Sequence, residues 1–136
     1  MIHFFFENTE EIHLHPSLKK WLTDVILSEN KKPGTLNFIL CDDEYLLEIN
    51  KHYLQHDYFT DIITFDYTKG KIISGDIFVS LQRISENAPE YNSGFDDELK
   101  RVLVHGILHL CGYGDKTEKE QKEMRNKENY YINLFP

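Results

Sequence analysis

The sequence predicts an α+β protein in which a small mixed sheet of about four strands is covered by helices. Segments of strand composition alternate with segments of helical hydrophobic periodicity, in the order β-α-β-α-β-β-α-α-α. The 136 residues, of which 40% are hydrophobic and 13% aromatic, can bury one core but are too few for two. No repeat and no Pro/Gly-rich linker divides the chain. We therefore expect a single domain over residues 1–136.

Four segments have the composition of strands, because β-branched and aromatic residues dominate them and turn residues flank them. These segments are Ile2–Glu7, Leu36–Leu40, Ile62–Asp66 and Asp76–Ser80. We expect the Lys-Pro-Gly sequence at 32–34 to break the chain before the second strand. A turn around Lys69 and Gly70 is expected to separate the third strand from the fourth.

Three helices are expected between or directly after these strands. The first follows Pro16 and extends to about Asn30, since apolar residues recur there at helical spacing. The second opens at Asp42, where an acidic residue suits the start of a helix. A short third helix starts at Leu81 and is stopped near Pro89.

Two further helices are expected near the end of the sequence. The longest helical pattern starts at Phe95 and ends at Gly112, where glycine is a natural C-terminal residue of a helix. Thr117 and Glu120 then have the spacing of a capping box, in which each side chain bonds the backbone of the other residue. This spacing predicts a last helix with a highly charged, solvated face.

The composition excludes several classes of protein. With 23 acidic and 15 basic side chains, the formal net charge is −8. The net charge therefore gives no reason to expect a nucleic-acid partner, and DNA is not expected as one. A local basic groove is compatible with this net charge. No apolar run approaches the roughly 20 residues that span a bilayer, and the first residues lack the features of a signal peptide. Two cysteines, Cys41 and Cys111, are too few for a disulfide framework. We therefore expect a cytoplasmic protein without a membrane partner.

The sequence HGILHLCGYGD, from His105 to Asp115, has the pattern of a metal site. His105 and His109 are four residues apart on a predicted helix, so both imidazoles project from one face. Gly112 and Gly114 let the chain reverse direction, which can bring Asp115 back towards the histidines. Two ring nitrogens and one carboxylate oxygen around an open fourth position are typical of a catalytic zinc site. We predict that His105, His109 and Asp115 bind one zinc ion.

A simpler interpretation is a pair of helical histidines, one of them buried and hydrogen-bonded, followed by an ordinary glycine cap. The glycine and the acid at suitable offsets favour the metal site. Gly106 stands where the zinc peptidase helix HExxH has its general base. Glycine cannot accept a proton, and inside a helix it costs up to about 1 kcal/mol relative to alanine. We therefore expect backbone or substrate to pass close to Gly106, and we do not expect a peptidase of the usual mechanism.

The histidine segment resembles the H-G-x-L-H-L-x-G-Y signature of the YbeY family of bacterial rRNA maturation factors, which precedes the family's third metal ligand. The matching positions are His105, Gly106, Leu108, His109, Leu110, Gly112 and Tyr113. Thr60–Phe65 resembles the family's T-D-V-L-S-F strand, and Gly75–Ile77 resembles its G-D-I strand. The three segments follow the family's order and spacing, so the similarity covers most of the chain from Leu47 to Asp115.

The resemblance implies a zincin-like α+β fold and one divalent ion per chain, usually taken as zinc. It also implies an endoribonuclease that acts in rRNA maturation and ribosome quality control. The best-known target of the family is the 3′ end of the small-subunit (16S) rRNA. The expected partners are therefore ribosomal RNA, the small ribosomal subunit and ribosomal proteins.

The sequence departs from the family pattern at two positions. Asp115 stands where the family's third ligand is normally histidine. A carboxylate is an accepted zinc ligand, so zinc binding should be retained. Its negative charge should make a water molecule at the site less acidic. Leu54 stands where the family generally has an arginine, six residues before the threonine of T-D-V-L-S-F. Arg83 is our candidate for the missing phosphate-binding cation. An equally supported interpretation is that Arg83 is an ordinary solvated residue of a helix. Weaker candidates are Lys51, His52 and His56.

We interpret the chain as a zinc-dependent endoribonuclease in rRNA maturation. Beyond the metal ligands, the candidate catalytic residues are Arg83 and Asp61, and the sequence does not identify a general base. Asp61 either orients a metal-binding histidine or caps a local turn. Two alternatives stay open. A non-catalytic, metal-stabilised ribosome-assembly factor should have a fourth protein ligand on the metal. A small metallopeptidase would need a carboxylate from elsewhere in the chain.

Overall fold

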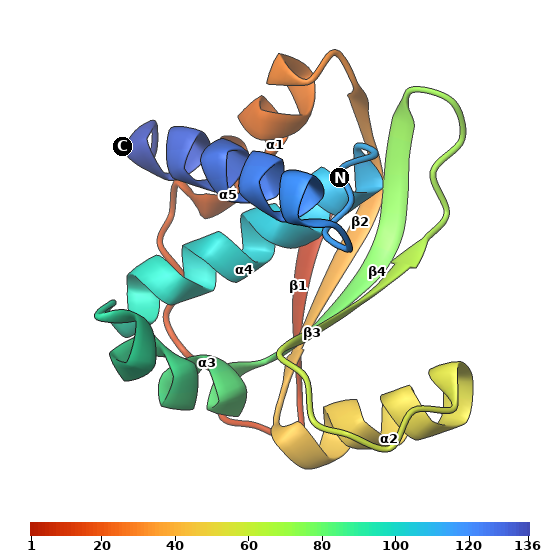
Figure 1. Ribbon diagram of the computed structural model, residues 1–136, viewed down its shortest axis with the longest axis vertical. Helices are drawn as coiled ribbons and strands as arrows, with labels where there is room; N and C mark the ends of the chain where they lie inside the picture. Colours follow the sequence, from red (N-terminus) through yellow and green to blue (C-terminus); the bar gives the residue numbers. More distant parts are fainter.

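The computed structural model describes residues 1–136 and has the predicted element order, with one short 3₁₀ helix added (Figure 1). The strands are β1 (Ile2–Glu7), β2 (Lys32–Cys41), β3 (Ile62–Asp66) and β4 (Ile72–Ser80). The helices are α1 (Leu18–Ser28), α2 (Asp43–Leu54), α3 (Leu81–Asn87), α4 (Phe95–Leu110) and α5 (Glu118–Asn133). The 3₁₀ helix η1 (Ala88–Tyr91) directly follows α3. None of the helices combines the length and the apolar character needed to cross a membrane.

The strands form one mixed sheet in the order β1-β2-β4-β3. β1 runs parallel to β2, and β2 runs parallel to β4, whereas β3 is antiparallel to β4 and lies at an edge of the sheet. Parallel neighbours need a crossover connection, and helices α1 and α2 lie in those connections. The predicted α+β architecture with a mixed four-stranded sheet is thus confirmed.

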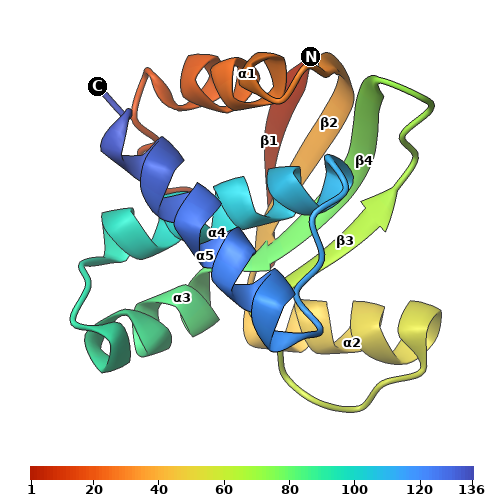
Figure 2. The ribbon, with the colours of Figure 1, turned by 45° about the horizontal axis from the view of Figure 1, so that its top comes forward.

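Helices cover both faces of the sheet (Figure 2). The main core lies on the face covered by α1 and α4, and Leu22, Phe38, Ile77 and Leu103 are fully buried there. A smaller cluster around Leu46 joins α2 to the opposite face. Helix α5 packs on α4 and contributes Met124 and Tyr131 to the main core. Helix α4 therefore lies between the sheet and α5.

The expected chain break at 32–34 is wrong, because these residues form the start of β2. Lys32 and Pro33 pair with β4, and the register shifts in a bulge between Pro33 and Leu36. β1 first pairs with β2 at Leu36, so the nitrogen of Pro33 faces no neighbouring strand. Proline, which has no N–H group, is tolerated in a sheet at such an unpaired edge or bulge.

Gly106 brings α4 close to the sheet. A Cβ atom at this position would lie 3.1 Å from Ile62 Cδ1 and 3.1 Å from Ile77 Cγ2, which is tighter than ordinary packing. Strand side chains of β3 and β4, rather than backbone or substrate, are therefore the groups that pass close to Gly106. Because Gly106 has no side chain, α4 can lie closer to β3 and β4 than a larger residue at this position would allow.

Candidate metal centre

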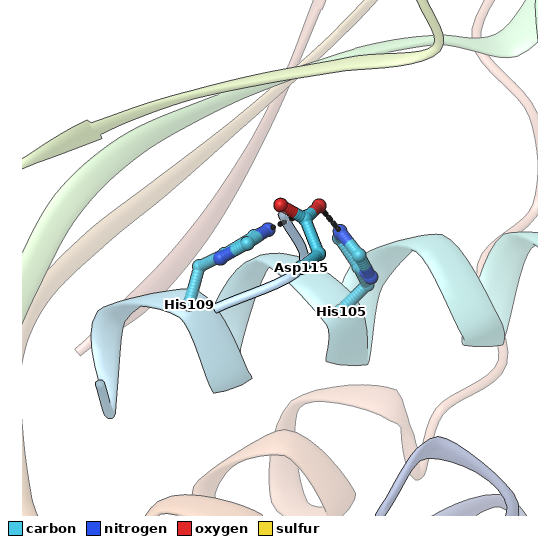
Figure 3. Close-up of side chains that lie close together, drawn as sticks. All are labelled: His105, His109 and Asp115. Atoms are coloured by element: carbon cyan, nitrogen blue, oxygen red, sulfur yellow. Dashed lines mark hydrogen bonds and ion pairs between the residues drawn. The ribbon is translucent and has the colours of Figure 1, made fainter. Parts of the chain in front are cut away.

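His105 and His109 project from the last two turns of α4 towards Asp115, which lies on the segment that follows the helix (Figure 3). The Nε2 atom of His109 is 3.1 Å from Asp115 Oδ2, and the Nε2 atom of His105 is 3.4 Å from the same oxygen. One ligand atom from each residue lies within 4.8 Å of the other two. The structure therefore brings together the three residues that the sequence singled out, in a group that could hold a metal ion.

A Schellman motif returns Asp115 to the histidines. Gly112 has a φ of +109°, which few residues with a side chain adopt. Its N–H donates to the carbonyl of His109 at 3.0 Å, and the N–H of Tyr113 donates to the carbonyl of Leu108 at 3.0 Å. The capping box then fixes the start of α5, because Thr117 Oγ1 accepts from Glu120 N and the Glu120 side chain accepts from Thr117 N. Asp115 is thus held between two defined helix ends.

Hydrogen bonds at the far nitrogen of each ring set the histidine tautomers. His109 Nδ1 lies 2.9 Å from the carbonyl oxygen of Tyr113, which can only accept, so Nδ1 carries the proton. His105 Nδ1 lies 2.7 Å from Glu128 Oε2 and donates to this carboxylate. In the neutral form of each ring, the Nε2 lone pair is then directed at the position shared with Asp115. This arrangement fits a metal ion, because ligating histidines generally donate their second ring nitrogen to such a partner.

Negative charge surrounds His105. Burial alone lowers the pKa of this imidazole, but the hydrogen bond and charge of Glu128, together with the charge of Asp115, outweigh it and raise the pKa. Burial by itself raises the pKa of Glu128, but His105 and Arg101 outweigh that effect and hold it low. The Asp115 carboxylate and two Nε2 lone pairs would repel one another at these distances. Positive charge at the position they share, from protons or from a cation, removes this repulsion. The site is therefore suited electrostatically to a divalent ion.

The candidate centre is open on two sides. No fourth His, Cys, Asp or Glu joins the group of three ligand residues. A cavity of about 580 Å³ extends from it over α4 and α5, and a second of about 610 Å³ extends towards β3 and the segment after α2. His105, Asp115 and Ile62 line both cavities. Several basic side chains border these cavities: Arg101, Lys122 and Arg125 in the first, and Lys116 in the second.

Arg83 lies in an ion-pair network between α2 and α3. Its NH2 group is 2.7 Å from Asp43 Oδ2, and its NH1 group is 3.2 Å from Glu86 Oε2. The Asp43 side chain is only 8% exposed, and its other oxygen accepts from Ser80 Oγ at 2.7 Å. Arg83 lines neither of the two cavities. These contacts give Arg83 a structural partner, and its role as a phosphate-binding cation stays a prediction.

The other candidates occupy different places around the centre. Asp61 lines the first cavity, where burial raises the pKa of its carboxyl group. Leu54 and His56 line the second cavity, and the ring of His56 stacks on Tyr58 at 5.2 Å between centroids. His52 pairs with Glu48 and lines neither cavity, like Lys51. Cys111 is half-buried beside the main core and is not part of the metal group.

Sequence reasoning missed Glu128, whose carboxylate contacts Nδ1 of His105. Its side chain is 5% exposed, although it belongs to a helix whose sequence is mostly charged. Met124, Glu128 and Tyr131 are the three buried positions of α5 and recur at helical spacing. A glutamate in phase with two apolar residues is the signal that could have identified a buried carboxylate.

Comparisons with known proteins agree with this arrangement. A family model described as Endoribonuclease YbeY matches residues 5–135. A protein named Endoribonuclease YbeY from Christiangramia forsetii is 53% identical over 134 residues, which cover 98% of this chain and 94% of that protein. The protein of the same name from Flavobacterium psychrophilum is 50% identical over 135 residues, which cover 99% of this chain and 96% of that protein.

A solved structure is similar as well. The solution structure of a Thermotoga maritima protein superimposes with a TM-score of 0.69 at 31% sequence identity, and the match covers 97% of this chain and 87% of that one. The family model spans nearly the whole chain, and the metal group lies on the segment that carries the family signature. The chain therefore belongs to the YbeY family.

Proposed function

We propose that this protein is a zinc-dependent endoribonuclease that acts in rRNA maturation, and that His105, His109 and Asp115 are its metal ligands. One observation carries the proposal. Two imidazoles whose tautomers are fixed and one carboxylate converge on a point that no fourth protein ligand closes, and cavities adjoin that point. Structural zinc sites are usually closed by four protein ligands, whereas catalytic sites leave a position open. The relatives named Endoribonuclease YbeY support RNA as the substrate.

The donor set favours a transition metal such as zinc over magnesium and calcium. Magnesium and calcium prefer oxygen ligands, and magnesium usually keeps several waters. Two imidazole nitrogens and one carboxylate oxygen suit zinc, iron or other transition metals. A divalent ion held here would supply Lewis acidity next to a phosphodiester group.

The residues around the centre have separate tasks in this proposal. His105, His109 and Asp115 hold the ion, and the open side admits one phosphodiester group of the RNA. Cations beside the site offset the negative charge of the transition state. Lys122 and Arg125 border one cavity and are candidates for this role. Arg83, the candidate from the sequence, lines neither cavity and would have to leave its ion pairs to take part.

Asp61 is the candidate for proton transfer. It lies in the cavity that His105 lines, and a carboxyl group whose pKa is raised by burial is better suited to exchange a proton near neutral pH. The substrate site that the family resemblance suggests is the 3′ end of the small-subunit rRNA. The corresponding partner is the small ribosomal subunit, and the compartment is the cytoplasm.

The proposal is tested with purified protein and intact ribosomes that carry precursor small-subunit rRNA. Bound metal is quantified, and RNA cleavage is measured for the wild type, for His105→Ala and for His13→Ala as the matched control. His13 is exposed and lines a cavity to which none of the three metal-group residues contributes. We expect zinc-dependent cleavage by the wild type and the control, and loss of both zinc and cleavage in His105→Ala.

A different outcome would favour the non-catalytic alternative. Ribosome association without metal-dependent cleavage in the wild type would identify a metal-stabilised assembly factor. Cleavage that persists in His105→Ala after removal of all metal would contradict the metal-dependent mechanism. Hydrolysis of peptides but not of RNA would favour the metallopeptidase.

A further inference from the structure

The carboxylate of Glu128 is enclosed, yet both of its oxygens have charged or polar partners. Its side chain is 5% exposed. Oε2 accepts a hydrogen bond from His105 Nδ1 at 2.7 Å, and Oε1 accepts one from Arg101 NH1 at 3.0 Å. A buried carboxylate is tolerated when it is paired in this way, and both contacts hold it in one orientation. Glu128 is therefore fixed between two residues of α4.

The two histidines differ in what holds them. His109 donates to the carbonyl of Tyr113, which belongs to the turn that directly follows α4. His105 donates to a side chain that is 23 residues away in the sequence and belongs to α5. Helix α4 and its C-terminal turn can thus orient His109 by themselves, whereas the orientation of His105 requires α5 to be in place.

Core packing sets the register of α5 at Glu128. Met124 and Tyr131, about one turn before and after it, are buried in the main core. Trp21 Nε1 on α1 also donates to the carbonyl of Tyr131 at 2.8 Å. Arg101 adds a second link, because its NH2 group donates to Asn129 Oδ1 at 2.9 Å. These contacts place the carboxylate beside His105.

We propose that Glu128 is a positioning residue of the metal centre, which fixes His105 with Nε2 turned to His109 and Asp115 and thereby couples metal affinity to the docking of α5 on α4. The inference rests on the proposed function, because it takes His105 as a metal ligand. Without the carboxylate, the ring of His105 is free to rotate, and its proton is free to move to Nε2. Nε2 must be unprotonated to bind the ion.

The test compares Glu128→Gln with Glu123→Gln in the full-length chain. Glu123 is an exposed residue of α5, so its replacement makes the same change in charge on the same helix without touching His105. Zinc affinity is measured by competition with a chromophoric chelator, and ligand geometry is followed in the visible absorption of the Co²⁺ form. Circular dichroism shows that each metal-free variant is folded.

We expect Glu128→Gln to weaken zinc binding by about tenfold or more, within the range for partners of metal-bound histidines. The amide oxygen of glutamine can still accept from His105 Nδ1, but a neutral acceptor forms a weaker bond than a carboxylate. Glu128→Ala, which has no acceptor, should bind still more weakly and change the Co²⁺ spectrum. Glu123→Gln should stay within twofold of the wild type.

Hydrogen exchange reports on the coupling itself. In the wild type, zinc should slow amide exchange along α5, and this effect should be reduced in Glu128→Gln. A purely structural role of Glu128 would lower the melting temperature of the variant but would leave the zinc affinity of the folded protein and its Co²⁺ spectrum unchanged.

The outcomes separate this inference from the proposed function. A folded Glu128→Gln variant with the zinc affinity and Co²⁺ spectrum of the wild type would overturn the inference while the metal site stands. A wild type that binds no zinc would overturn both. If Glu128→Ala does not fold, the glutamine variant, which keeps the size of the side chain, decides the question.

Discussion

Replacing Glu29 with glutamine should destabilise the protein and loosen the turn around Tyr113, which follows α4. The Glu29 side chain is 11% exposed and accepts hydrogen bonds from three groups. Tyr113 OH donates to Oε1 at 2.7 Å, Tyr131 OH donates to Oε2, and Lys127 Nζ lies 3.3 Å from Oε2. Tyr113 is also the residue whose carbonyl accepts from Nδ1 of His109. One carboxylate thus connects the end of α1, the turn and α5.

The size of the effect follows from these bonds. Hydrogen bonds to a charged group contribute about 1.5–3 kcal/mol each, and bonds that share one carboxylate are not additive. Glutamine keeps one acceptor oxygen but loses the charge and places an NH₂ group against one of the donors. We expect the free energy of unfolding to fall by about 2–3 kcal/mol. For a chain of this length, this corresponds to a melting temperature lower by roughly 6–12 °C.

The effect should depend on pH with a definite sign. Burial alone raises the pKa of Glu29, but the bonds from Tyr131, Tyr113 and Lys127 outweigh it and lower the pKa below its usual 4.5. A lowered folded-state pKa means that the stabilisation is complete above the unfolded-state pKa and is lost as pH falls through the folded-state value. The difference between wild type and Glu29→Gln should therefore be constant near neutral pH and shrink below about pH 4.5.

Urea denaturation at neutral pH and at several acidic pH values measures this difference. Asp24→Asn on α1 is the matched control, because Asp24 is exposed and pairs only with Lys20 one turn away. Such surface pairs contribute little, about 0–1 kcal/mol. The reasoning is refuted if Glu29→Gln is no less stable than Asp24→Asn, or if its destabilisation persists undiminished at acidic pH.

Three further predictions concern the metal centre and RNA cleavage. Zinc at a hundred times its Kd should stabilise the wild type by about 2.7 kcal/mol, whereas His105→Ala should gain far less in calorimetry; equal gains would contradict the ligand assignment. Asp115→His, which restores the usual family ligand, should retain zinc and retain or increase cleavage, because a neutral ligand leaves more positive charge on the ion; loss of zinc would count against this geometry. Arg83→Ala should reduce cleavage tenfold or more without changing zinc content, since a charge-assisted contact between arginine and phosphate is worth roughly 1.5–3 kcal/mol. Cleavage at the wild-type rate would exclude Arg83 as the phosphate-binding cation.

Features governed by local chemistry could be predicted from the sequence. β1 and β3 have the predicted bounds, since short runs of apolar residues between turn residues define them. The capping box of Thr117 and Glu120 is confirmed, because its two bonds join residues three positions apart. The positive φ of Gly112 is likewise confirmed as the end of the histidine helix. Each of these features depends on a few adjacent residues.

Features that depend on distant neighbours could not be predicted. Whether Lys32–Gly34 breaks the chain or extends a strand depends on β4 being available to pair with it. The hydrogen bond from His105 to Glu128 depends on the way α5 packs across α4, which no local pattern specifies. Arg83 pairs with Asp43, which lies 40 residues earlier, so this ion pair could not be predicted from the sequence either.

A titration of metal-free protein with zinc is the most direct test of the central claim. Cleavage of precursor small-subunit rRNA in intact ribosomes is measured as zinc is added to the wild type and to His109→Ala. Our account predicts that wild-type cleavage rises with zinc and reaches a plateau at one ion per chain, while His109→Ala stays inactive at the same zinc concentrations. Cleavage that is independent of zinc, or that zinc restores equally in His109→Ala, would contradict the account.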